Sequence, residues 1–157
     1  MRHEATVEGV GVSVDESERG VPTALVHARD ELLPILISPS QAQAIQHALE
    51  GIPLERPFTH DLLVEMVTDF GGSIDRVRID DLADGTFYAK IDVELFRDGD
   101  RTKFVYDARP SDGIALALRV NCPIEVETEV LDVAGHPPEE FDVEGLDLGT
   151  SEDPTTD

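Results

Sequence analysis

The sequence predicts one α+β domain built on a curved, mostly antiparallel, barrel-like sheet with three helices. Three observations support this fold class. Apolar and polar residues alternate along several segments, helix start and stop signals bracket three others, and a strand, hairpin and helix follow one another twice. The 157 residues fit a single domain, which is large enough to bury a core without disulfides, and the chain has only one cysteine, Cys122.

Strands are predicted where apolar residues recur at every second position or form short runs between turn signals. Asp98-Gly99 predicts a hairpin turn, because both residue types tolerate a positive φ angle. Arg29-Asp30-Glu31 predicts a second turn near the start of the chain. The strands predicted in this way cover residues 10–14, 24–26, 33–37, 86–95, 104–106 and 124–131.

Helices are predicted at three places. Residues 38–41 form a capping box with proline at the first helical position, and this helix ends at Gly51. A second helix over 59–70 carries an apolar stripe and ends at Gly71. The third begins at 110–112 with a proline, a serine and an aspartate.

The chain also has the pattern of an internal duplication. A shift of about 71 residues aligns 39–45 with 110–116, and in each copy a strand and a hairpin precede the helix start. The predicted unit is therefore strand, hairpin and helix, used twice. Residues 57–70 are then an insertion between the copies, and 124–131 form a closing strand.

The charge is strongly acidic, with 34 Asp and Glu against 12 Lys and Arg and a formal net charge of −22. Taken alone, this argues against nucleic-acid binding, because phosphate backbones bind where cationic side chains cluster. Nine of the acidic residues lie in 132–157, which has no Lys or Arg. We therefore expect a folded domain over 1–133, a disordered acidic tail over 134–157, and adaptation to a salt-rich cytoplasm.

The expected location is the cytoplasm and not a membrane. No cationic leader followed by an apolar segment opens the sequence, and no apolar run approaches the roughly 20 residues that span a bilayer. An exposed edge strand of the predicted sheet is compatible with a homo-oligomer, but the sequence does not fix its stoichiometry.

Two short clusters, 56–61 and 107–112, are dense in groups that could act on a substrate. Each precedes or opens a predicted helix, where free backbone N–H groups attract anions, and each contains an arginine suited to a phosphate. His60 could transfer protons near neutral pH. A structural interpretation stays open, since Asp61 and Asp112 also suit the first turn of a helix, and Arg109 could simply pair with an aspartate across the turn.

At these clusters the sequence resembles the bifunctional nuclease family. The resemblance implies a compact α+β domain with a duplicated unit and nuclease activity on DNA and RNA. It covers roughly residues 5–133 and rests on several motifs in the same order. The matching stretches are 43–51, 56–63, 81–82, 85–89, 107–119 and 122–124.

We therefore expect a nuclease that hydrolyses phosphodiester bonds in DNA and RNA with low sequence specificity. A non-catalytic binding or assembly domain of the same fold is the alternative. Candidate metal ligands are Asp61, Asp107 and Asp112, whose hard oxygen atoms suit Mg²⁺ or Mn²⁺. The candidate catalytic residues are His60, Asp61, Asp107, Arg109 and Asp112, and the candidate substrate-binding residues are Arg56, Ser111 and Arg119.

Overall fold

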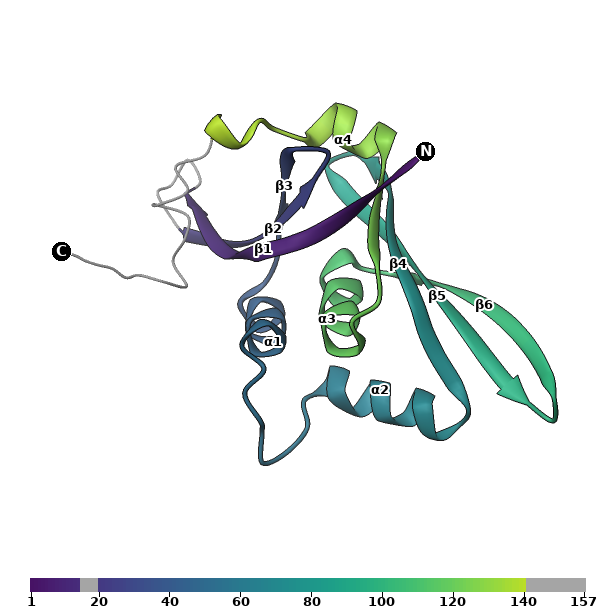
Figure 1. Ribbon diagram of the computed structural model, residues 1–157. Helices are drawn as coiled ribbons and strands as arrows, with labels where there is room; N and C mark the ends of the chain where they lie inside the picture. The colour runs from purple at the N-terminus through teal and green to yellow at the C-terminus, as the bar shows by residue number, and fades with distance from the viewer. Residues whose placement is uncertain (15–19, 141–157) are drawn as a thin grey trace.

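The computed structural model describes residues 1–14 and 20–140. In this part of the chain, four α-helices and one short 3₁₀ helix accompany a seven-stranded mixed sheet (Figure 1). The α+β class is confirmed. The elements are β1 Arg2–Val14, β2 Gly20–Ala28, β3 Glu31–Leu36, α1 Pro39–Glu50, α2 Thr59–Asp69, β4 Gly72–Ala83, β5 Thr86–Arg97, β6 Asp100–Ala108, α3 Pro110–Val120, β7 Ile124–Glu127, α4 Thr128–Ala134 and η1 Pro138–Glu140.

The strand order is β3-β2-β1-β7-β4-β5-β6, and only the β4–β7 pair is parallel. The first four residues of β1 pair with β7, whereas its later residues pair with β2, so this strand joins the two parts of the sheet. Because β3 and β6 lie at opposite ends of the order, the sheet is open. The predicted barrel-like closure is therefore wrong, although the curvature is visible in Figure 1.

Local signals in the sequence correctly indicate most of the turns and helix ends. Residues Arg29, Asp30, Asp98 and Gly99 all have positive φ angles at the two predicted hairpin turns. The predicted capping box is present at the start of α1, and Gly51 ends this helix in the left-handed conformation.

The predicted closing strand over 124–131 is only half correct. Strand β7 stops at Glu127, and the chain turns into α4, a fourth helix beyond the three predicted. Glu127 pairs with Arg2, the first residue of β1, so no residue of β1 is left to continue the ladder. Val130 and Leu131 instead reach the core from α4.

The predicted duplication is only approximate. Each half has three antiparallel strands followed by a helix, namely β1 to α1 and β4 to α3. The halves differ in their third strands, which have six residues in β3 and nine in β6. Helix α2 precedes β4, and β7 lies between the two meanders in the sheet, so the second half is not a copy of the first.

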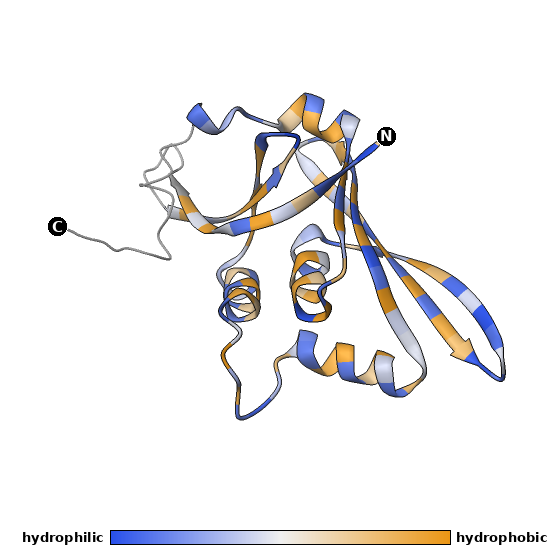
Figure 2. Cartoon of the chain, in the orientation of Figure 1, coloured by the Kyte–Doolittle hydropathy of each residue, from blue (hydrophilic) through white to orange (hydrophobic). Residues whose placement is uncertain are grey.

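Helices α1, α2 and α3 form a layer beside the sheet (Figure 1). The buried core lies between the sheet, α1 and α3, with two further residues from α4. Figure 2 shows apolar and polar residues alternating along β4, β5 and β6, as expected for strands with one covered face. Helix α3 is the central helix and buries seven of its eleven residues. None of the described helices is both long and apolar enough to cross a membrane.

The last described residues lie beyond the boundary predicted for the folded domain. His136 forms a pair of backbone hydrogen bonds with Leu32 on β3. Most of the predicted acidic tail, residues 141–157, lies outside the described residues.

The close approach of α3 to the sheet depends on Gly113. A Cβ atom at this position would lie 2.7 Å from Cγ1 of Val77 on β4. We expect Gly113→Ala to lower the free energy of unfolding by about 1 kcal/mol or more, although alanine is the better helix former. Urea unfolding measures this change. In a Val77→Ala background the same substitution should cost less, and an equal loss in both backgrounds would contradict this packing argument.

Candidate active site

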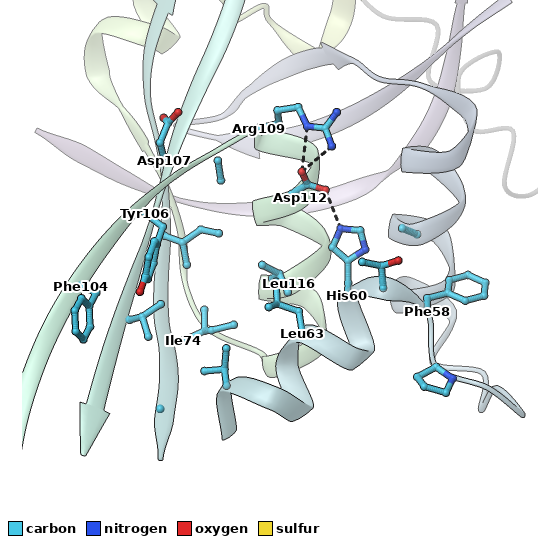
Figure 3. Close-up of a pocket in the computed structure, with 18 of the residues that line it drawn as sticks. Phe58, His60, Leu63, Ile74, Phe104, Tyr106, Asp107, Arg109, Asp112 and Leu116 are labelled. Carbon is cyan, nitrogen blue, oxygen red and sulfur yellow. Dashed lines mark hydrogen bonds and ion pairs between the residues drawn. The ribbon is translucent and has the colours of Figure 1, made fainter. Parts of the chain in front are cut away.

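A groove of about 1240 Å³ opens between the helix layer and the inner face of β4, β5 and β6 (Figure 3). Its walls are mostly apolar, with Leu63 and Val67 on the helix side and Ile74 and Val93 on the sheet side. The predicted apolar stripe of the second helix faces this space and the solvent, and no residue of α2 is buried. The groove is therefore a large apolar surface that the described part of the chain leaves uncovered.

The charged end of this groove is formed where the starts of α2 and α3 meet. His60 Nε2 lies 2.8 Å from Oδ1 of Asp112, and Arg109 Nε donates to the other carboxylate oxygen of Asp112 at 3.1 Å. Figure 3 shows Asp112 between the imidazole and the guanidinium. Two residues predicted from separate clusters, 52 positions apart, thus make direct contact.

These three side chains differ in how firmly the fold holds them. His60 is 16% exposed and Asp112 is 31% exposed, whereas Arg109 is 72% exposed. The first turn of α3 is anchored by Pro110 and Ser111, two buried residues that directly precede Asp112. The fold therefore fixes the His60 imidazole and the Asp112 carboxylate, whereas the Arg109 guanidinium extends into solvent.

Asp61 and Arg119 form a separate interaction behind the groove. Arg119 Nε donates to Asp61 Oδ1 at 2.7 Å, and Nη1 donates to the carbonyl oxygens of Ala44 and Ala115. The Arg119 side chain is 8% exposed. One guanidinium therefore ties together α1, α2 and α3, and its position suits a structural role more than contact with a substrate.

The environment of Asp61 favours its charged form. Burial alone would raise the pKa of Asp61, but hydrogen bonds from Arg119 and from the Phe58 backbone N–H hold this pKa below its ordinary value. The interaction therefore stabilises the fold at neutral pH, and this contribution is lost in acid as Asp61 is protonated. Phe58 is the N-cap of α2, and the Asp61 side chain accepts the capping hydrogen bond from the Phe58 backbone N–H.

The remaining predicted site residues lie apart from the His60–Asp112 contact. Asp107 is at the rim of the groove, where its carboxylate is 3.5 Å from Lys90 Nζ and points away from His60 (Figure 3). Arg56 is exposed and does not line the groove. Ser111 is buried beneath the first turn of α3, so its hydroxyl group is not available at the groove surface.

The three aspartates predicted as metal ligands do not gather at one point. Asp61 is engaged by Arg119, Asp107 by Lys90, and Asp112 by His60 and Arg109. Among the described residues, no group of three or more His, Cys, Asp or Glu side chains has the arrangement of a metal site. The donor set thus does not fit Mg²⁺ or Mn²⁺ held by these three carboxylates.

Cys122 is not poised as a nucleophile. Burial raises the pKa of its thiol to about 11, so the group is protonated at neutral pH.

Two aromatic residues of the groove, Phe104 and Tyr106 on β6, were predicted only as part of a strand and not as part of a site. Their spacing of two residues was the available signal, because it puts both aromatic rings on one face of the sheet.

Comparisons with known proteins match the part of the chain that contains the groove. The sequence model of the bifunctional nuclease domain family matches residues 24–139 of this chain. This chain belongs to the bifunctional nuclease domain family. A relative from Mycobacterium tuberculosis, itself named only as an uncharacterized protein, is 43% identical over 130 residues, which are 82% of this chain and 75% of the relative.

Plant members of the family are more distant and much longer. Bifunctional nuclease 2 of Oryza sativa subsp. japonica is 30% identical over 98 residues, covering 62% of this chain and 30% of the plant protein. Bifunctional nuclease 2 of Arabidopsis thaliana is 29% identical over 96 residues, covering 60% of this chain and 29% of the plant protein. The matched region therefore spans less than a third of these plant relatives.

The different environments of two arginines give a stability test. We expect Arg119→Met to lower the free energy of unfolding by about 3 kcal/mol, because it removes the cation that pairs with Asp61 and the side-chain hydrogen bonds to two backbone carbonyls. Arg109→Met should change stability by less than about 0.5 kcal/mol, because the Arg109 side chain is largely in solvent. Urea unfolding of both variants measures the difference. Equal losses of unfolding free energy in the two variants would contradict the assignment of Arg119 as structural and Arg109 as solvent-exposed.

Proposed function

We propose that this protein is a phosphodiester hydrolase that cleaves DNA and RNA with low sequence specificity. The observation that carries the proposal is the contact of His60 and Arg109 with the same carboxylate, Asp112, at the end of an open groove. Membership in the bifunctional nuclease domain family and the names of the plant relatives support the same reaction class.

His60 is the group best placed to move a proton. The Asp112 carboxylate can only accept at its contact with Nε2, so in the neutral ring the proton is on Nε2 and Nδ1 is the base. A water molecule attacking phosphorus would give its proton to Nδ1 while the bond from phosphorus to the leaving oxygen breaks. The protonated ring can then return that proton to the leaving oxygen, with Asp112 stabilising the imidazolium.

Arg109 is the group best placed to bind the phosphate. Its Nε and one terminal nitrogen contact Asp112, which orients the planar guanidinium, while the exposed side of the group remains open to an anion. As negative charge builds on the non-bridging oxygens, this cation stabilises it. Asp112 thus positions both active groups without itself needing to touch the substrate.

The low specificity follows from the apolar walls of the groove. Phe104 and Tyr106 offer partly exposed aromatic rings on the sheet wall of the groove, and stacking on such rings does not distinguish one base from another. In this interpretation Asp61, Ser111 and Arg119 support the site from outside the groove, and Arg56 is an exposed candidate for substrate contact beyond it.

The alternative function is binding or assembly without catalysis. The observation that favours it is the apolar character of the groove walls, which would also suit a protein segment. Against it, His60 and Arg109 both line the groove, and neither is sealed in the core.

The broader setting belongs to the same proposal. We infer a folded domain that includes residues 1–133, an acidic extension that follows it, and a salt-rich cytoplasm in which the net charge of −22 favours solubility. A guanidinium that binds phosphate by direct hydrogen bonds suits such a solvent, because salt at molar strength screens the attraction between charges that are more than about 3 Å apart.

Cleavage of labelled single-stranded RNA and DNA by the purified full chain tests the proposal. We expect His60→Ala and Asp112→Asn each to lower the rate by about 100-fold or more, because they remove the proton acceptor or its orienting carboxylate. Arg109→Ala should lower it comparably through lost charge stabilisation. Assays across a salt series, with added Mn²⁺ and with a chelator, establish the conditions for activity.

The matched control is His27→Ala on β2, which does not line the groove and should cleave at the wild-type rate. Wild-type activity in His60→Ala would overturn the assigned site. No cleavage by folded wild-type protein under any of these conditions would overturn the hydrolase proposal and leave the binding alternative.

A further inference from the structure

The two edges of the sheet are protected very differently. The β3 edge is short, contains Pro34, which has no N–H to donate, and is held by the backbone hydrogen bonds between Leu32 and His136. These are the features that keep an edge strand from pairing with another chain. The β6 edge has nine residues, no proline and no neighbouring strand on its outer side among the described residues.

The β6 edge also exposes apolar side chains on both of its faces. Val105 is 57% exposed on the outer face, and Tyr106 is 52% exposed on the groove face beside Phe104. Eight of the nine residues of this strand are exposed, and Figure 1 shows β5 and β6 projecting away from the helix layer. A long edge of this kind is open for pairing without a clash against the helices of its own chain.

The sequence of β6 is complementary to itself in an antiparallel pair. Its midpoint is Phe104, so full-length pairing of two copies places Phe104 opposite Phe104 and residue 101 opposite residue 107. Arg101 then faces Asp107 of the other copy, and the symmetry produces this pair twice. Both side chains are more than half exposed and can reach across the new strand pair.

We propose that the protein forms a two-fold symmetric dimer in which the β6 strands of two copies pair antiparallel and join the sheets. Directly opposite residues share one face of a sheet, so the aromatic residues of both copies lie next to each other on the groove side. The two grooves then meet at the dimer axis. Arg101 of the second copy meets Asp107 on the other face of the joined sheet, the face on which these residues contact Glu94 and Lys90 of their own chain.

Charge reversal tests this pairing, because the dimer needs opposite charges at 101 and 107. The readout is the mass of the full chain by light scattering after size exclusion, over a range of protein concentrations. The wild-type protein should have twice the monomer mass of 17.2 kDa at micromolar concentration. Arg101→Asp and Asp107→Arg each place like charges opposite one another and should weaken the dimer at least about 10-fold.

The double variant that carries both reversals restores opposite charges and should recover the wild-type dimer affinity. Lys103→Asp is the matched control, since Lys103 faces Val105 in this register and its reversal should have a smaller effect. A monomeric wild-type protein, or single reversals that leave the dimer unchanged, would overturn the proposal. So would a double variant no better than the singles. Because the readout is mass, the result does not depend on whether the protein is a nuclease.

Discussion

The arrangement of the helix layer depends on one buried guanidinium. Arg119 binds the carboxylate of Asp61 on α2 and carbonyl oxygens on α1 and α3, so a single side chain fixes three helices relative to one another. Asp61 follows His60 directly in the sequence. Holding Asp61 therefore sets the position of His60 and brings it to Asp112 across the gap between α2 and α3. The His60–Asp112 contact at the groove therefore depends on the Arg119–Asp61 interaction behind it.

Local chemistry makes much of the fold predictable. Turn residues, capping residues and the period of two along the strands are enough to predict the two hairpins, α1, α3 and most strands. The errors arose where partners distant in the sequence decide the outcome. Whether 124–131 continues as a strand depends on where β1 begins, and whether the sheet closes depends on which strands β3 and β6 meet.

The candidate site shows the same division. The sequence marked His60 and Asp112 as chemically interesting, but nothing local indicated that they touch. It also could not separate Arg109 from Arg119, since the two differ chiefly in burial. The net charge of −22 likewise describes the whole surface and says little about a groove whose charged end contains two cationic or protonatable groups around one carboxylate.

Catalysis by His60 requires that Asp112 hold the ring proton on Nε2, so that Nδ1 is the free base. Nitrogen-15 NMR of the histidine side chains measures this directly, with His60→Ala identifying the signal. We predict that the neutral His60 ring carries its proton on Nε2 and that this preference is lost in Asp112→Asn. A neutral ring protonated on Nδ1, or a tautomer unaffected by Asp112→Asn, would contradict this role of Asp112.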